Sequence, residues 1–489
     1  MKSHTEVRAA IGAKKSGNAD GAKGGRKANA SSQRSPEDKP RRVARRRGAH
    51  SPMGEVMLQR YKAERRIWSE KMLMALERGV KGGRWFSLND KIGREETLSL
   101  AWEKVETNAG ACGVDNITIA RFRKDSQTRL LAVKEQLKSR SYEPLPVKRA
   151  WIDKAGKGKK KRPLGIPAVK DRIVQQALRM VIEPIFEKRF AQHSYGFRPG
   201  RSCHDALRRV EGQLVEGNSH VVDIDIEGYF DAIDQNRLLE LVKEEIADKA
   251  VLDLIKKFLQ AGVVETDGKI QASETGTPQG GVISPLLSNL YLDALDHLME
   301  SEGYAMTRYA DDMVILCRSE QEAHEALAKV REWMTSVGLS LHPEKTRVVD
   351  MSLTSAYFDF LGYRFKRGKT GRILRLVAPK SLDKLKEKVR RYTKRCNAYS
   401  MEDIIRRINP RLRGWFGYFR QAHTNIHRGL DGWVRMRLRS IYRKRQRKRG
   451  RGRGRDNQRW PNRHFAELGL FSLEEAKAEA ISLQKGVKC

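Results

Sequence analysis

The stretch Arg308-Tyr309-Ala310-Asp311-Asp312-Met313-Val314-Ile315-Leu316 decides the fold, because two adjacent carboxylates interrupt what otherwise reads as two apolar strands. Strand side chains alternate between faces, so Tyr309 and Asp311 point the same way and a tight turn presents both acids at its tip. Neighbouring carboxylates repel each other, and their pKa values rise unless cations neutralise them. Mg²⁺ suits such a turn because it binds carboxylate and phosphate oxygens. We interpret the stretch as a metal-holding β-hairpin, although an ordinary solvated Asp-Asp turn has the same pattern.

A second acidic stretch occurs earlier in the chain, in residues 221–231. Period-two alternation puts Val222, Ile224 and Ile226 on one face of a strand and Asp223 and Asp225 on the other. A lone strand of this kind is usually a solvated edge. Metal-assisted phosphoryl transfer, however, needs carboxylates from separate strands around two cations that lie ~3.5–4 Å apart. The two acidic stretches together therefore indicate this chemistry.

The composition favours a polyanionic partner. The chain of 489 residues has 98 Lys and Arg against 60 Asp and Glu, a formal net charge of +38. Nucleic acid is the first candidate, and an anionic membrane surface is the rival, although no apolar run approaches the length of a membrane span. The five cysteines are scattered, which predicts neither a disulfide framework nor a zinc site. Residues 1–50 contain no aromatic residue, and we expect a disordered basic tail there.

Periodicity predicts a mixed α and β chain. Residues 55–140 have a helical pattern, and residues 142–167 form a hairpin whose tip, Asp153 to Arg162, carries many cations. Such a basic tip is either a solvated charge run or a cover for a nucleotide triphosphate. Further helices are expected over 171–181, 237–260 and 320–337, with a further helix beginning at Ser284-Pro285 and a strand over 339–341. Strand, helix, hairpin, helix and strand is the split β-α-β order.

The C-terminal part is strongly cationic. Residues 371–460 hold 29 Lys and Arg against 6 Asp and Glu. Three helices are predicted there, over 381–398, 401–421 and 430–448. We expect Trp415 and Phe419 to be largely core, because aromatic residues at helical spacing more often pack than stack on bases. The arginines exceed what solubility requires, so nucleic-acid binding that weakens steeply with salt is expected.

Six motifs follow one another in a specific order: 162–167 (Arg-Pro-Leu-Gly-Ile-Pro), 195–199 (Tyr-Gly-Phe-Arg-Pro), 225–231 (Asp-Ile-Glu-Gly-Tyr-Phe-Asp), 276–285, the Tyr-Ala-Asp-Asp box and 360–363 (Phe-Leu-Gly-Tyr). This set resembles the reverse transcriptases encoded by bacterial group II introns, the intron-encoded maturases, from about residue 90 to residue 470. The resemblance implies an α+β right-hand polymerase, with fingers and a split β-α-β palm, followed by an α-helical thumb/maturase domain. The expected division is a tail over 1–54, fingers and palm over 55–375, thumb/maturase over 376–470 and a short C-terminal tail over 471–489.

Carried over by matching position, the resemblance implies that Asp225, Asp311 and Asp312 are the catalytic acids. Asp225 and Asp311 would hold two Mg²⁺ ions, and Ile226 would add its backbone carbonyl. Asp223 lies on the same face as Asp225, but the family pattern places the metal-binding acid five residues before the aromatic residue of its motif. Asp225 is therefore preferred.

The resemblance also implies a deoxynucleoside triphosphate site. Phe230 would lie beneath the sugar and exclude a ribose 2′-hydroxyl, although core packing is its alternative role. Gln279 would contact the incoming nucleotide, Arg162 its triphosphate, and Lys345 the departing pyrophosphate. Template, primer and intron RNA would be contacted by the cationic side chains of the turn after residue 194 and of the C-terminal helices: Arg198, Arg201, Arg411, Arg413, Arg420 and Arg439.

The expected protein is an RNA-directed DNA polymerase that binds its group II intron RNA, assists splicing and copies the RNA into DNA during retrohoming. Its partners would be the intron RNA, an RNA template, a DNA primer or target DNA, and deoxynucleoside triphosphates, and we expect no membrane partner. We expect it to act in the bacterial cytoplasm as part of a ribonucleoprotein. Many relatives continue into an endonuclease with paired cysteines, and we expect none here. Two alternatives remain: a domesticated enzyme of DNA repair or phage defence, and a non-catalytic RNA chaperone.

Overall fold

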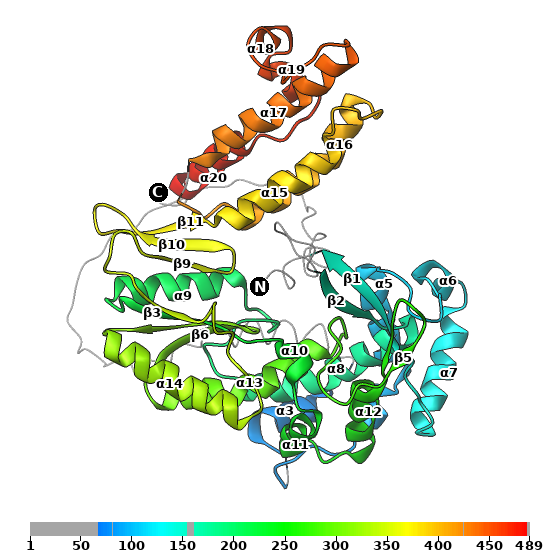
Figure 1. Ribbon diagram of the computed structural model, residues 1–489. Coiled ribbons are helices and arrows are strands. Elements are labelled where there is room, and N and C mark those ends of the chain that lie inside the picture. Colours follow the sequence, from blue (N-terminus) through cyan, green and yellow to red (C-terminus); the bar gives the residue numbers. More distant parts are fainter. Residues whose placement is uncertain (1–66, 81, 154–160, 424, 487–489) are drawn as a thin grey trace, which may run out of the picture.

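The computed structural model describes residues 67–80, 82–153, 161–423 and 425–486 (Figure 1). The predicted N-terminal tail, 1–54, and the tip of the basic hairpin, 154–160, lie outside the described residues. Three groups of elements follow along the chain: helices with a small sheet, a four-stranded sheet between helices, and a stack of helices. This is the predicted α+β architecture.

Helix α8 (Val169–Arg189) is the centre of the first group. Most of its residues are buried, polar ones included, and Ile173, Ala177 and Val181 are fully buried. The preceding helices pack around it and keep their polar faces outward. They are α3 (Glu70–Arg78), α4 (Asn89–Ile92), α5 (Glu95–Asn108), α6 (Ile119–Lys124) and α7 (Ser126–Lys138).

The predicted basic hairpin is present beside α8. Strands β1 (Val147–Asp153) and β2 (Lys161–Ile166) pair antiparallel, and the short strands β4 (Val263–Val264) and β5 (Ile270–Gln271) extend the sheet in the order β2-β1-β4-β5. Gly165 donates its N–H to the carbonyl of Gln279 at 2.6 Å. The hairpin is therefore attached to the 276–285 loop.

The second group is built on the sheet β6-β7-β3-β8: β6 (Ala305–Tyr309), β7 (Asp312–Cys317), β3 (His220–Asp225) and β8 (Arg347–Asp350). Helices α13 (Ser284–Ser301) and α14 (Glu320–Ser336) cover one face, and α9 (Cys203–Val215) covers the other (Figure 1). Val222 and Ile224 point to the α13–α14 side, whereas Val221 points to the α9 side. The period-two prediction for this strand is confirmed.

Three connecting helices complete this group, and one expected strand is absent from it. The helix predicted over 237–260 is two helices, because Asp248 accepts the N–H groups of Ala250 and Val251 and starts a new one. The strand predicted over 339–341 is reduced to one bridge between Leu341 and Ile226. The connecting helices are α10 (Tyr229–Ala232), α11 (Gln235–Glu245) and α12 (Lys249–Gln260).

An aromatic joint links the second group to the C-terminal helices. It begins in the sheet β11-β10-β9, formed by β9 (Tyr357–Phe360), β10 (Tyr363–Arg367) and β11 (Ile373–Val377). Tyr418 donates its hydroxyl to the carbonyl of Leu361 at 2.7 Å, and Tyr363 donates to the carbonyl of Tyr418 at 2.5 Å. His204 of α9 also contacts the Tyr418 carbonyl, at 2.8 Å.

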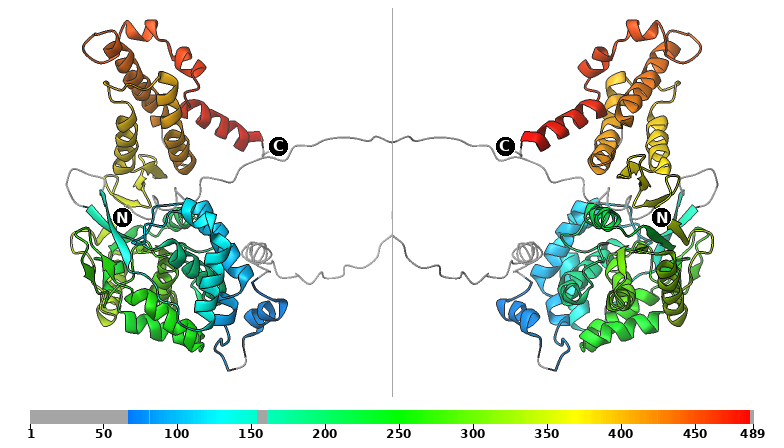
Figure 2. Two further views of the ribbon diagram at one scale, coloured as in Figure 1. Left: turned by 90° about the vertical axis from the view of Figure 1, so that its right-hand side faces the viewer. Right: turned by 90° about the vertical axis from the view of Figure 1, so that its left-hand side faces the viewer.

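The C-terminal helices rise from one end of the molecule (Figure 2). All three predicted helices are present, and Phe419 is buried as expected. Within the short C-terminal tail expected over 471–489, the described residues contain a helix that packs on its neighbours. Asp431 accepts the N–H groups of Leu473 and Glu474 at the start of this helix. The helices are α15 (Pro379–Tyr392), α16 (Met401–Phe419), α17 (Ile426–Arg445), α18 (Asp456–Arg459), α19 (Asn462–Glu467) and α20 (Leu473–Gly486).

A buried acid on α8 predicts a pH-dependent stability. Asp171 accepts the hydroxyl of Tyr142 at 2.5 Å and the N–H of Leu145 at 3.1 Å, and burial raises its pKa to about 6. The native state therefore holds this proton more tightly than the unfolded chain, and the free energy of unfolding falls as pH rises from about 4 to about 6. The contribution is on the order of 3 kcal/mol. Asp171→Asn should flatten this slope in melting temperatures measured across that range, and an unchanged slope would contradict the assignment.

Candidate active site

The acids of the two predicted stretches meet at one end of the sheet β6-β7-β3-β8, which we call the palm sheet. Asp225 is the last residue of β3 and lies directly opposite Asp312, the first residue of β7. Opposite residues of antiparallel strands have Cβ atoms roughly 5 Å apart on the same face. Asp311 precedes Asp312 in the turn between β6 and β7, where Ala310 has a φ of 61°. The structure thus brings Asp225, Asp311 and Asp312 together.

The carboxylates lie in a poorly solvated place. Burial raises the pKa of Asp312 well above its ordinary value, and repulsion from Asp311, Asp223 and Asp225 raises it further. Its Oδ1 atom is buried and accepts no hydrogen bond from the described residues. Asp223 is 6% exposed, and burial raises its pKa to about 6 although Arg347 lies beside it at 3.4 Å. This cluster therefore has a deficit of positive charge.

Lys345 supplies part of the missing charge. Its Nζ lies 2.6 Å from Oδ2 of Asp225. The loop that carries it is fixed to the end of β3, since His342 donates its N–H to the Asp225 carbonyl at 2.8 Å and Thr346 contacts the same residue. The family resemblance implies that Lys345 contacts the departing pyrophosphate. The direct contact with Asp225 was not predicted.

The residues expected at the nucleotide are held by neighbouring backbone. Nε of Arg162 donates to Oε1 of Gln279 at 3.2 Å. Phe230 is 5% exposed, and its carbonyl accepts the N–H of Thr277 at 2.8 Å. A Cβ on Gly276 would lie 2.7 Å from that carbonyl oxygen, so only glycine allows this approach. Ile226 is buried next to Asp225, at 6% exposed.

One further acid joins this region. Asp231 directly follows Phe230, and burial raises its pKa whereas Arg149 and Arg162 of the hairpin lower it. The carboxylate thus lies near the two hairpin arginines. Sequence reasoning quoted Asp231 within its motif without giving it a role, and its position after the aromatic residue was the available signal.

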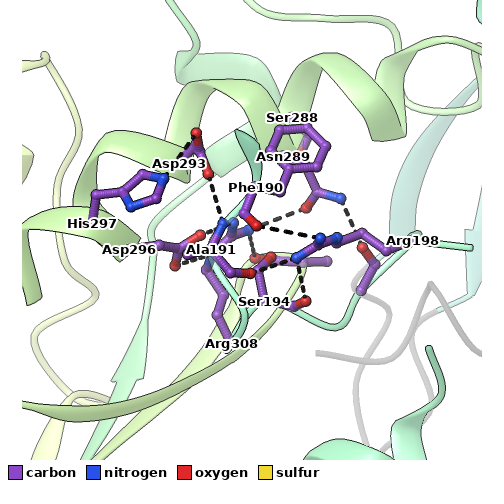
Figure 3. A network of polar contacts seen from close by, with 12 residues as sticks. Phe190, Ala191, Ser194, Arg198, Ser288, Asn289, Asp293, Asp296, His297 and Arg308 are labelled. Atoms are coloured by element: carbon purple, nitrogen blue, oxygen red, sulfur yellow. Dashed lines mark hydrogen bonds and ion pairs between the residues drawn. The ribbon is translucent and has the colours of Figure 1, made fainter. Parts of the chain in front are cut away.

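The structure argues against a phosphate contact for Arg198, which was predicted to bind nucleic acid. Its side chain is 1% exposed and forms an ion pair with Glu187 at 2.9 Å. The remaining N–H groups donate to backbone carbonyls, including those of Ser194 at 3.0 Å and Phe190 at 3.3 Å (Figure 3). The guanidinium has a structural role, because its donors are used inside the protein.

Arg439 also has a structural role, although its side chain lines a cleft beside α17. It is 4% exposed, and it donates to the carbonyl of Trp460 and to Oδ1 of Asn462, both at 2.8 Å. Arg201 is half-buried and donates to the carbonyl of Ser194 at 3.2 Å.

Three arginines of α16 and of the residue that follows it lie closer to solvent than Arg198 and Arg439 do. Arg413 and Arg420 are exposed. Arg411 is half-buried, and its Nη2 donates to the Tyr392 hydroxyl at 2.7 Å. A nucleic-acid role for these three stays a prediction.

Comparison with known proteins identifies the chain. Residues 152–365 match the family "Reverse transcriptase (RNA-dependent DNA polymerase)", and residues 382–460 match "Group II intron, maturase-specific domain". Protein YkfC of Escherichia coli (strain K12) is 33% identical over 297 residues, which cover 53% of this chain and 76% of that protein. The chain belongs to the group II intron reverse transcriptase and maturase family.

Other relatives are matched over smaller shares. The group II intron-encoded protein LtrA of Lactococcus lactis subsp. cremoris is 40% identical over 205 residues, which cover 42% of this chain and 33% of LtrA. A solved structure, the "Partial Cas6-RT-Cas1--Cas2 complex", is 26% identical with a TM-score of 0.34 and covers 51% of this chain and 41% of that chain. This chain thus spans about a third of LtrA.

Membership of this family implies divalent metal ions, and the acidic cluster fits them. The described residues contain no ready-made group of three His, Cys, Asp or Glu side chains that could hold an ion. Mg²⁺ in such enzymes, however, is held by one or two carboxylates together with waters and substrate phosphates. The unpaired Oδ1 of Asp312 and the mutual repulsion of the acids are what a divalent ion would relieve. None of the described helices is long and apolar enough to cross a membrane.

The repulsion predicts a conflict between stability and function at Asp312. Asp312→Asn removes a half-buried carboxyl group that its acidic neighbours repel when it ionises, so the melting temperature in EDTA should rise by about 2–4 °C. The gain should be larger at pH 8 than at pH 6, because the raised pKa of the acid makes its ionised form more costly as pH increases.

The matched control is Asp350→Asn. This carboxylate accepts the N–H of Ser352 at 2.8 Å and its pKa is lowered, so its loss should not stabilise the protein. Equal melting temperatures for Asp312→Asn and the unsubstituted protein at pH 8 would contradict the interpretation.

Proposed function

We propose that this protein is an RNA-directed DNA polymerase encoded by a group II intron, which binds the intron RNA to assist splicing and copies it into DNA during retrohoming. The observation that carries the proposal is the register that sets Asp225 opposite Asp312, beside Asp311. Family membership gives the reverse-transcriptase and maturase parts, and bacterial relatives favour a bacterial cytoplasmic ribonucleoprotein. The retrohoming cycle is inferred from these.

Asp225 and Asp311 are the proposed ligands of two Mg²⁺ ions, with the carbonyl of Ile226 as a further ligand. When bound, the ions supply charge stabilisation for in-line attack of the primer 3′-hydroxyl on the α-phosphorus. Asp312 adds negative charge at the base of the cluster. In the structure the ammonium of Lys345 pairs with Asp225. If a divalent ion held that carboxylate, Lys345 would be available to contact the leaving pyrophosphate. The bond between the primer 3′-oxygen and the α-phosphorus forms as the bond between that phosphorus and the pyrophosphate oxygen breaks.

The nucleotide is proposed to lie between the hairpin and the palm. Arg162 would contact the triphosphate and Gln279 the nucleotide, since the two side chains are already joined by a hydrogen bond. Phe230 would exclude a ribose 2′-hydroxyl. Support comes from its backbone, which Gly276 and Thr277 hold in place, so the ring cannot easily retreat from a bulkier sugar.

The C-terminal helices are proposed to hold the RNA. A cleft of about 750 Å³ opens between α17 and the loop that follows it. Trp433, Arg435 and Arg453 are among its lining residues, together with Asn457 and Asn462, and the lining contains no acid. The Nε atom of Arg435 is buried and has no partner among the described residues. Such a cationic, amide-rich cleft is suited to the phosphates of a structured RNA.

Primer extension tests the polymerase proposal. With an RNA template, a DNA primer, deoxynucleotides and Mg²⁺, the protein should give full-length DNA, and Asp311→Asn should lower the rate by at least about a thousandfold. Phe230→Val should admit ribonucleotides in the same assay. No product from the unsubstituted protein, with RNA binding retained, would instead favour a splicing chaperone.

Salt-dependent RNA binding tests the cleft. Arg435→Gln and Arg453→Gln should each weaken binding of the intron RNA and reduce the slope of log affinity against log salt by about 1. Arg463→Gln is the control, because Arg463 is an exposed arginine paired with Glu467 and is not among the cleft-lining residues. Equal losses in all three variants would show that the effect is one of net charge alone.

A further inference from the structure

A completely buried guanidinium lies beside the Asp-Asp turn. Arg308 is 0% exposed, and its Nε donates to Oδ1 of Asp296 at 2.7 Å, with a second bond from Nη2 to Oδ2 (Figure 3). The remaining nitrogen, Nη1, donates to the carbonyl of Ala310 at 3.0 Å and to Oδ1 of Asn289 at 3.1 Å. The planar fork of arginine thus joins three partners at once.

Ala310 is where this network reaches the catalytic acids. Its φ of 61° is a left-handed conformation, which is unfavourable for a residue that has a Cβ atom. Its carbonyl is buried, and Arg308 Nη1 is the donor that satisfies it. Because Ala310 immediately precedes Asp311, the conformation of this one residue sets the direction in which the two following carboxylates point.

The network also continues away from the turn. Nδ2 of Asn289 donates to the carbonyl of Gly196 at 2.7 Å. A Cβ on Gly196 would lie 2.2 Å from the backbone nitrogen of Ala310, so this glycine packs directly on the turn. The N–H of Tyr195 donates to the Arg308 carbonyl at 2.8 Å, and the N–H of Arg308 donates to the carbonyl of His193 at 3.0 Å.

Stability alone is a weak explanation for such a pair. Replacing a buried ion pair by apolar residues of similar volume is often neutral, since the charges lose their hydration when they are buried. An apolar pair of this kind would, however, leave the Ala310 carbonyl without a donor. The guanidinium of Arg308 is therefore needed at the turn itself, where it donates to the Ala310 carbonyl.

We propose that Arg308, held by Asp296 and Asn289, is a positioning residue that fixes the Ala310 turn in the form in which Asp311 receives a divalent ion. The Tyr195-Gly196 segment acts with it as a backbone support of the turn. This inference rests on the proposed polymerase function for its consequence, but it concerns metal binding by the protein itself.

The decisive variant is Arg308→Lys. Lysine keeps a positive charge beside Asp296, but a single ammonium cannot hold Asp296, Asn289 and the Ala310 carbonyl in the same geometry. The full chain should fold and bind primer–template in EDTA as before. Its affinity for Mn²⁺, measured by electron paramagnetic resonance and corrected with Asp311→Asn as background, should fall at least tenfold. The Mg²⁺ concentration for half-maximal extension should rise by a similar factor.

The matched control is Arg198→Lys, the same change in the neighbouring buried pair with Glu187, whose donors reach Ser194 and Phe190 but not Ala310. It should leave the Mn²⁺ affinity within twofold. Equal loss in both lysine variants, or no loss in a folded Arg308→Lys protein, would overturn the proposal.

A second variant covers the case in which Arg308→Lys does not fold. Asn289→Ala removes the acceptor of Arg308 Nη1 and the donor to the Gly196 carbonyl. It should weaken Mn²⁺ binding several-fold, and unchanged binding in that variant would refute the inference. If the unsubstituted protein binds Mn²⁺ at Asp311 but extends no primer, the polymerase proposal fails and the positioning role stands.

Discussion

Repulsion between carboxylates at the end of the palm sheet is the constraint on which the rest of the structure depends. Asp223, Asp225, Asp311 and Asp312 lie close enough together to raise the pKa of Asp312. Strand register enforces this proximity, because a slip by one residue would turn every side chain of β3 to the other face and expose its apolar set. The hydrophobic contacts of Val222 and Ile224 with α13 and α14 thus hold the acids where electrostatics alone would separate them.

The cations of the chain fall into two classes. Arg198 and Arg308 are buried among carbonyls and carboxylates near the Asp-Asp turn, and Arg439 has the same kind of environment in the helical domain. Arg413, Arg420 and Arg453 are exposed. The net charge of +38 therefore overstates the positive charge that the surface of the protein offers to a partner.

Much of the fold was accessible from the sequence, since alternation in 221–226, the turn at 310–312 and the periodicity of the C-terminal helices depend on local pattern. The burial of Arg198 was not, because a sequence reveals a charge but not the Glu187 and carbonyl groups that surround it after folding. The same holds for Arg308, whose partner Asp296 is on another element. Helix α20 was not predicted, because the carboxylate that accepts the N–H groups at its start, Asp431, lies about forty residues earlier in the chain. Polar contacts between residues that lie on different elements were thus the part of the structure that could not be predicted from the sequence.

The aromatic joint around Tyr418 has a mechanical consequence. Two tyrosine hydroxyls and His204 tie the base of the helical domain to the palm at three hydrogen bonds, so this domain is a lever with a stiff pivot. Helix α17 has 20 residues and extends about 30 Å, so tilting the pivot by roughly 5° would move the far end by ~3 Å. A few tenths of an ångström at the base of the helical domain would thus be amplified to several ångströms at its far end.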